Sequence, residues 1–291
     1  MNSFNNNFCN LCPNECNVDR NAFKGGCGES NTLKISKYAL HHYEEPLISG
    51  TNGSGTVFFT GCALKCAFCQ NYELSRSLRG KEITPKELSK IFIELENMGA
   101  HNINLVTPSH FTKEIAEAFE IYRPKIPIVY NTHSYEKIEN LDIIAPYVDI
   151  YLPDLKFFSP EISYRYTGKS DYFITAEKAI KFMMDSKKTV IENGLIKSGV
   201  IVRHLVLPLC SNDSTNIINW FKSNQRGGAH LSIMSQFTPL VKNSKLKELN
   251  RPITKREYDK VVNHALNSGI ENVFIQQLSS ASENYIPSWD Y

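Results

Sequence analysis

The pattern of apolar and polar positions along the chain predicts strands that alternate with helices. Short apolar runs that end in polar residues are typical of buried strands, and residues recurring every three or four positions are typical of amphipathic helices. The predicted strands cover residues 56–59, 102–107, 127–131, 148–152, 200–207 and 230–234, with a short last run at 273–275. The predicted helices cover residues 84–99, 112–122, 135–144, 175–185, 214–223 and 255–267.

This alternation predicts parallel βαβ units and therefore an α/β fold. Parallel strands must be covered on both faces or curl into a barrel. The length of 291 residues suits one α/β barrel domain, which we place at residues 51–291 with a C-terminal extension. Residues 1–50 contain four cysteines and then a polar stretch, so we expect a small cysteine-rich segment and a connector there.

Composition and charge change this picture little. Apolar residues make up 42% of the chain, and a net charge of +2 gives no strong attraction to nucleic acid or to an anionic membrane. No run of 18 apolar residues predicts a membrane span, and the first residues have neither the basic nor the apolar part of a signal peptide. We therefore expect a cytoplasmic location, where eight cysteines would be reduced or bound to metal.

Three cysteines form a loop directly after the first predicted strand. Cys62, Cys66 and Cys69 have the spacing C-x3-C-x2-C, so a loop can turn all three thiolates toward one point. A cubane iron–sulfur cluster held by three cysteines leaves one iron free to bind a small molecule. The alternatives are a chance grouping or half of a zinc site. Zinc sites usually pair two such units, and no second unit follows nearby.

A second cysteine group lies near the start of the chain. Cys9, Cys12, Cys16 and Cys27 lie in a turn-rich segment that is too small to build a core of its own. Metal binding would then supply the local folding free energy. Zinc at a four-cysteine site and a second iron–sulfur cluster both fit this spacing, and four free thiols are the remaining alternative.

Polar side chains gather where the predicted strands end. In a parallel barrel the loops after these strand ends build the active site, so we expect a shared pocket. Helix capping would also explain Ser109 or Thr132, and a surface ion pair would also explain Asp154 with Lys156. The candidates from successive strands are Thr107, Ser109 and His110; Asn131, Thr132 and His133; Asp154 and Lys156; and Arg203 and His204.

The cysteine spacing, with Phe68 just before the third cysteine, resembles the signature of the radical S-adenosylmethionine (SAM) superfamily. Longer phrases resemble the stand-alone homologues of pyruvate formate-lyase activating enzyme over essentially the whole chain. They include residues 129–131 (VYN), 149–156 (DIYLPDLK), 203–208 (RHLVLP) and 234–239 (MSQFTP). The resemblance implies a partial (β/α)6 barrel similar to a TIM barrel.

The resemblance also implies a reaction. A 4Fe–4S cluster at Cys62, Cys66 and Cys69 would chelate SAM through its free iron and cleave it after reduction by a donor such as flavodoxin or ferredoxin. The 5'-deoxyadenosyl radical would abstract a hydrogen atom from a carbon of a peptide, a protein (a glycyl-radical enzyme among them) or a small molecule. Such oxidoreductase or activase chemistry is anaerobic.

Residue roles follow from the same resemblance. His110 and His204 are predicted to act in catalysis as donors of a proton or a hydrogen atom, and His133 and Cys210 are further candidates for this role. The superfamily's Gly-Gly-Glu, which usually holds the methionine amino group, is replaced here by Thr107-Pro108-Ser109-His110. The predicted cofactor-binding residues are Phe68, Thr107, Ser109, His110, Asn131, Thr132, Asp154, Lys156 and Arg203.

A function of a different class competes with this one. The four N-terminal cysteines and the basic tract at residues 242–256 would also suit a non-enzymatic zinc- or iron-binding module that contacts nucleic acid or protein. The tract also contains Glu248 and Pro252, which favours a solvated loop. A zinc protein would be colourless and stable in air, whereas a cluster protein would be brown and air-sensitive.

Overall fold

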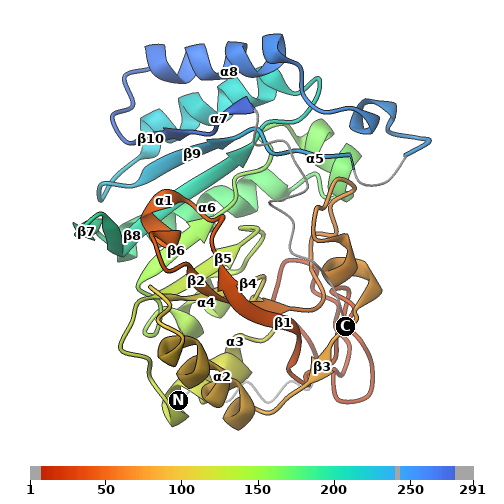
Figure 1. The fold of residues 1–291 in the computed structure, drawn as a ribbon. Helices are drawn as coiled ribbons and strands as arrows, with labels where there is room; N and C mark the ends of the chain where they lie inside the picture. The colour runs from red at the N-terminus through yellow and green to blue at the C-terminus, as the bar shows by residue number, and fades with distance from the viewer. Residues whose placement is uncertain (1–7, 240–242, 279–291) are drawn as a thin grey trace.

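The computed structural model describes residues 8–239 and 243–278, which form an α/β fold around one mostly parallel sheet (Figure 1). The strand order is β10-β9-β8-β6-β5-β4-β2-β1-β3, and the sheet does not close. The predicted partial barrel is therefore confirmed, with a seventh parallel strand at its edge. The parallel strands are β2 (Ser54–Phe59), β4 (Ile103–Val106), β5 (Ile128–Thr132), β6 (Ile150–Pro153), β8 (Leu195–Leu205), β9 (His230–Met234) and β10 (Val273–Ile275).

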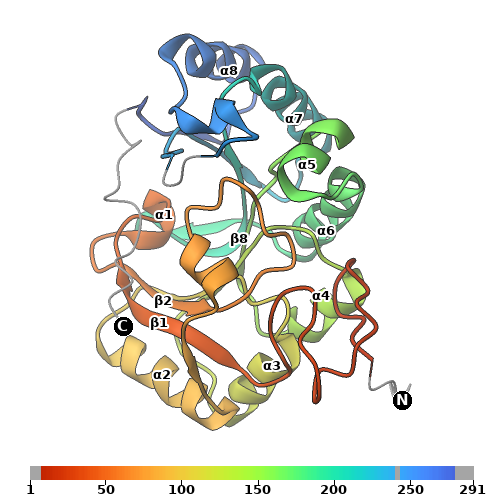
Figure 2. The same cartoon turned by 90° about the vertical axis from the view of Figure 1, so that its right-hand side faces the viewer.

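Most of the helices follow one another around the outer side of this sheet (Figure 2). Six of them correspond to predicted helices: α2 (Pro85–Asn97), α3 (Thr112–Ile121), α4 (Ile138–Ile144), α6 (Tyr172–Ser186), α7 (Ser211–Asn224) and α8 (Lys255–Asn267). Thr84 caps α2 by a reciprocal pair of hydrogen bonds with Glu87, which satisfies two donors at the helix start. Within the described residues no helix is both long and apolar enough to cross a membrane.

Several elements do not correspond to a predicted one. The largest is β1 (Lys34–His41), which pairs antiparallel with β2 inside the stretch that the sequence indicates is a polar connector. Among the residues that the structure describes, its outer edge carries only the short β3 (Lys81–Glu82), so most of its side chains stay partly exposed and their pattern does not resemble a buried strand. The others are α1 (Pro46–Ser49), the π-helical turn η1 (Glu73–Ser77), α5 (Pro160–Thr167), β7 (Val190–Glu192) and the 3₁₀ turn η2 (Lys247–Asn250).

Alternate residues of the central strands enter two different cores. Tyr130 and Tyr151 point to the helix side and join the large core between sheet and helices. Val129 points to the inside of the curled sheet, where it packs in a small apolar cluster with Ile48 of α1. Each fully buried side chain of this size contributes about 2 kcal/mol to folding. Because α1 fills this part of the interior, the polar interior residues lie toward the carboxyl ends of the strands.

Candidate functional site

The cysteine loop begins at Gly61, directly after β2. Gly61 has φ +82°, and a Cβ atom there would lie 2.7 Å from Cγ of Glu29 and 3.0 Å from the carbonyl oxygen of Cys27. Only glycine adopts this conformation readily and lets the N-terminal segment approach so closely. The next residue, Cys62, donates its backbone N–H to the same carbonyl at 3.1 Å. The N-terminal segment therefore supports the loop from behind.

Cys62, Cys66 and Cys69 all line one pocket at the carboxyl ends of the strands. Burial raises the pKa of the Cys62 and Cys66 thiols, which Lys156 partly opposes through its positive charge. Iron binding would replace these thiol protons, and three thiolates on one loop are the donor set of an iron–sulfur cluster. The three cysteines therefore fit a cubane.

Across residues 8–239 and 243–278, no group of three or more His, Cys, Asp or Glu side chains is arranged to hold a single metal ion. A cubane is held through separate iron atoms, so its cysteine sulfurs do not have to meet at one ion.

Aromatic packing fixes the middle of the loop. The ring of Phe68 meets the rings of Phe157 and Tyr166 edge-on, with centroid distances of 5.7 and 6.1 Å. The backbone N–H of Ala67 donates to the Tyr166 carbonyl at 2.8 Å. Phe68 also lines the pocket, as predicted for a residue beside the cofactor.

A buried network of charges from the ends of β1, β6 and β8 also lines the pocket. The Asp154 carboxylate lies 2.6 Å from Nζ of Lys156 and 2.8 Å from Nε of Arg203. Arg203 also lies 3.1 Å from the Glu44 carboxylate and donates to Oδ1 of Asn131 at 2.6 Å. Two cations and two carboxylates thus balance one another, and all five side chains line the pocket.

The mutual contacts of Asp154 and Lys156 shift both pKa values toward the charged form. Burial by itself would raise the pKa of Asp154, but Arg203 and Lys156 outweigh it and hold the pKa below its usual value. Burial likewise opposes the charge on Lys156, but Asp154 raises its pKa above the ordinary value. Glu44 differs, because burial raises its pKa despite the nearby Arg203.

The ends of β4 and β5 supply backbone and hydroxyl groups to the same pocket. Thr107 adopts a left-handed backbone conformation with φ 58°, and its N–H donates to the Asn131 carbonyl at 2.9 Å. Such conformations are uncommon away from glycine and often occur at functional sites. Thr132 lines the pocket as well, while its hydroxyl donates to the Glu136 carboxylate.

The loop after β4 holds two more predicted site residues, and both lie outside the pocket. Ser109 and His110 are buried but do not line the pocket. The imidazole of His110 lies 2.6 Å from the Thr60 carbonyl, and Ser109 lies 3.4 Å from the imidazole of His133. Burial lowers the pKa of His110 to about 3, so it is neutral. The loop that replaces Gly-Gly-Glu therefore presents only Thr107 to the pocket.

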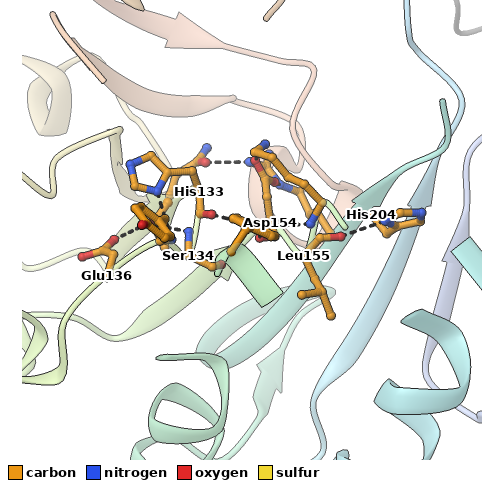
Figure 3. Close-up of polar contacts among 12 residues, drawn as sticks. His133, Ser134, Glu136, Asp154, Leu155 and His204 are labelled. Carbon is orange, nitrogen blue, oxygen red and sulfur yellow. Dashed lines mark hydrogen bonds and ion pairs between the residues drawn. The ribbon is translucent and has the colours of Figure 1, made fainter. Parts of the chain in front are cut away.

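The remaining two histidines have different positions. His204 does not line the pocket, because its Nδ1 lies 2.7 Å from the Leu155 carbonyl (Figure 3) and its Nε2 2.9 Å from the Ser214 hydroxyl. His133 does line the pocket, and burial lowers its pKa to about 4. The contacts of His204 join β8 to the chain after β6 and to α7, so this side chain positions these elements relative to one another.

Sequence reasoning missed Glu44 as a site residue. The chain after β1 turns inward here, and the Glu44 carboxylate accepts from the amides of Asn104 at 3.1 Å and Asn131 at 3.4 Å. The sequence places Glu44 in a polar stretch, where a carboxylate is ordinarily exposed. Gln236 after β9 was missed too; its carbonyl accepts from the Gln70 side chain at 2.5 Å beside the cysteine loop.

The predicted N-terminal metal ligands lie close together. A Cβ on Gly25 would lie 3.4 Å from Sγ of Cys27 and 3.9 Å from Sγ of Cys16, so both sulfurs face one small space. Burial, and to a smaller extent negative charge on Cys16, Cys27 and Cys9, raises the pKa of Cys12 to about 12. Cys16 and Cys27 thus meet at one space, and Cys12 lies within reach of their charge.

Comparison with known proteins decides the family. Residues 56–205, just over half of the chain, match the radical SAM superfamily. The chain belongs to the radical SAM superfamily. Its family segment runs from β2 to β8 and contains the three cysteines of the loop together with Asp154, Lys156 and Arg203, whereas Glu44 lies before it.

Relatives of this radical SAM protein extend the comparison. An uncharacterized protein of Methanocaldococcus jannaschii, MJ0674, is 28% identical over 91% of this chain and 76% of its own length. The pyruvate formate-lyase-activating enzyme of Clostridium pasteurianum is 26% identical over 59% of this chain and 69% of its own.

Solved structures share the fold. Streptococcus suis SuiB bound to S-adenosylmethionine superposes with a TM-score of 0.55 at 13% identity, over 78% of this chain and 51% of SuiB. SuiB bound to its precursor peptide SuiA gives 0.53 at 13% identity, over 76% and 48%. This chain therefore spans about half the length of SuiB. Membership of the superfamily implies a 4Fe–4S cluster and SAM, and it supports an enzyme.

Proposed function

We propose that this radical SAM enzyme cleaves SAM reductively and abstracts a hydrogen atom from a carbon of a peptide, protein or small-molecule substrate. The observation that carries the proposal is one pocket lined both by the three cysteines and by a buried ionic network. When bound, the cluster and SAM supply the electron and the 5'-deoxyadenosyl radical. The protein's own residues bind and orient the reactants.

We assign the three thiolates of Cys62, Cys66 and Cys69 to the cluster. Lys156 and Arg203 are the cations of the ionic network, and each is 17% exposed or less at its side chain. Such cations suit the methionine carboxylate, because a charge-assisted hydrogen bond is strong in a buried site. Asp154 holds both cations in place through its two oxygens.

The rest of the pocket offers groups for the remaining parts of SAM. Asn131 and Thr132 at the end of β5 provide an amide and a hydroxyl, which suit a ribose. Phe68 provides an aromatic ring that packs against Phe157 and Tyr166 behind it. We assign binding of the amino group to the backbone near Thr107, whose left-handed conformation ends β4 at the pocket.

The pocket suits a substrate with both polar and apolar parts. Its lining combines charged, amide, hydroxyl and imidazole groups with apolar side chains such as Phe58, Leu205 and Met234. The SuiB neighbour binds a precursor peptide, and the C. pasteurianum relative is an activating enzyme, which supports a peptide or protein as one substrate class.

The cleavage reaction is tested under anaerobic conditions. We expect the reconstituted wild type to absorb light at about 400 nm, as thiolate-ligated clusters do. With dithionite and SAM it should form methionine and 5'-deoxyadenosine. The C62A/C66A/C69A variant should form neither product. Cys210, a further candidate donor from the sequence, is buried and does not line the pocket, so a matched Cys210→Ser variant controls for general effects of cysteine removal. Formation of 5'-deoxyadenosine by the triple variant would refute the assignment.

A second experiment identifies the substrate class. The reconstituted enzyme is incubated with lysate from cells grown in deuterated medium, after separation into a small-molecule filtrate and a macromolecular fraction. Mass spectrometry then shows which fraction passes deuterium into 5'-deoxyadenosine. Transfer from the macromolecular fraction indicates a peptide or protein, and transfer from the filtrate a small molecule. Absence of transfer from both would contradict hydrogen abstraction from a cellular carbon.

A further inference from the structure

The N-terminal cysteines are the largest chemical feature that the proposed reaction does not use. Cys12 and Cys27 are buried, with 7% and 4% of their surfaces exposed, whereas Cys9 and Cys16 are partly exposed. The quartet therefore reaches from the protein surface to its interior. A group bound there would have one edge near solvent and the other against the barrel.

The inner edge of the quartet is hydrogen-bonded directly to the loop that holds Cys62, Cys66 and Cys69, which we call the catalytic loop. The carbonyl of Cys27 accepts from the N–H of Cys62 at 3.1 Å. The side-chain amide of Asn14 also donates to the carbonyl of Ala63 at 2.8 Å. A short chain of covalent bonds with a single hydrogen bond thus joins Sγ of Cys27 to Sγ of Cys62.

Several contacts fix this segment on the barrel. Arg20 is buried, donates to the His110 carbonyl at 2.8 Å and lies over the ring of Phe111 at 5.7 Å. Nζ of Lys137, just before α4, lies 2.6 Å from the Glu15 carboxylate. The quartet is therefore held at a fixed place beside the loop between β2 and η1.

The local chemistry of the quartet suits an iron–sulfur cluster. Cys9, Cys12 and Cys16 supply three ligands within one short turn-rich segment, and Cys27 supplies a fourth after a longer connection. Iron–sulfur sites use such runs of closely spaced cysteines, whereas structural zinc sites usually combine two short pairs. The N–H of Gly26 donates to Sγ of Cys16 at 2.9 Å, and hydrogen bonds to cluster sulfurs tune the reduction potential.

We propose that Cys9, Cys12, Cys16 and Cys27 hold a second iron–sulfur cluster, and that it passes electrons to the catalytic cluster through the Cys27–Cys62 hydrogen bond. This role, but not the second cluster itself, depends on the proposed function. The pocket side of the catalytic loop is the place for SAM and substrate, so an electron that arrives from the N-terminal side does not compete with them. The donor is a low-potential one-electron carrier of the flavodoxin or ferredoxin class.

The electron count balances without any bond change at the quartet. The donor is oxidised by one electron, and the second cluster is reduced and then reoxidised. The cluster at Cys62, Cys66 and Cys69 is reduced by that electron, which the cleavage of SAM then consumes.

The first test is the metal content of variants reconstituted anaerobically with iron and sulfide. The C62A/C66A/C69A variant should retain about four iron and four sulfide ions per chain, and the wild type about twice as many, as two cubanes require. Its dithionite-reduced EPR signal should not change when SAM is added. Zinc alone, or no metal, in this variant would overturn the second cluster.

The second test separates the quartet from the catalytic loop. The C9S/C16S variant changes only the two partly exposed cysteines, and circular dichroism checks that it folds. It should keep about half of the wild-type iron and an EPR signal that SAM shifts. If it keeps as much iron as the wild type, the site assignment is wrong.

The relay is tested by freeze-quench EPR of the SAM-shifted signal after mixing with reduced flavodoxin. Reduction of the catalytic cluster should be slower by about tenfold or more in C9S/C16S than in the wild type or in Cys210→Ser. Dithionite titration to completion confirms that the catalytic cluster can still be reduced. An equal rate with flavodoxin would refute the relay. If the reconstituted wild type forms no 5'-deoxyadenosine, the proposed function is refuted instead. The metal counts, and with them the second cluster, would be unaffected.

Discussion

Replacing Asp154 with asparagine removes the negative charge that lies between two buried cations. Lys156 would lose a carboxylate at 2.6 Å, whereas Arg203 would keep Glu44 at 3.1 Å and Asn131 at 2.6 Å. Breaking a buried ion pair on one side costs about 3–5 kcal/mol, because the other charge stays buried without its partner. Since Arg203 keeps two partners, we expect the free energy of unfolding to fall by about 3 kcal/mol, the lower end of that range.

The same variant changes how stability depends on pH. The folded-state pKa of Asp154 lies below its ordinary value, because Arg203 and Lys156 outweigh the effect of burial. Its contribution is therefore fully present above the unfolded pKa of about 3.9 and is lost as pH falls through the lower folded value. D154N should lose stability less steeply than the wild type when pH falls below about 4.

Urea unfolding of the protein without cluster or SAM measures both effects, with circular dichroism as the readout. Adding K156M to D154N should recover part of the loss, because it removes the cation left without a partner. Asp185→Asn serves as the control, since that carboxylate pairs with Arg226 at the surface and should have no measurable effect. If D154N is as stable as the wild type, or if K156M makes it worse, the buried network does not work as described.

Three further predictions concern the elements around the site. Gly61→Ala should lower both the melting temperature and the iron bound on reconstitution much more than Gly168→Ala, which shares a positive φ but has open space around it; equal effects would contradict the role of close packing. Burial raises the pKa of Glu136 to about 7, so wild-type stability should fall between about pH 4.5 and 7, where only the unfolded carboxyl loses its proton, and urea unfolding of E136Q should lack this fall. Arg20→Met removes a charged hydrogen bond to the His110 carbonyl and should lower the free energy of unfolding in urea by about 2 kcal/mol. An unchanged unfolding midpoint would contradict this prediction.

The elements with strong local signals were predictable from the sequence. α8 has the predicted bounds, because its capping residue Thr254 and its regular apolar spacing act within the helix itself. β2 is buried along its whole length, as its apolar run predicts. By contrast, β1 forms because β2 offers it a hydrogen-bonding edge, and nothing local in its sequence announces that partner.

The candidate site divides in the same way. The cysteine spacing and the polar strand ends predict which loops meet, since parallel strands place their carboxyl ends at one edge. They do not show which way each side chain points. Ser109 and His204 follow or lie in the same strands as pocket residues, but they turn to the interior packing instead.

The sequence by itself determined three features: the α/β class, the set of loops that meet at one end of the parallel strands, and the three-cysteine loop suited to an iron–sulfur cluster. Each of them depends on short-range periodicity or spacing. Only the tertiary structure decided that Glu44 faces Arg203 and that the carbonyl of Cys27 meets the N–H of Cys62. The physical reason is that both contacts join residues far apart in the chain. The way the open sheet curls around its interior decides which residues meet, and no local sequence pattern encodes such long-range contacts.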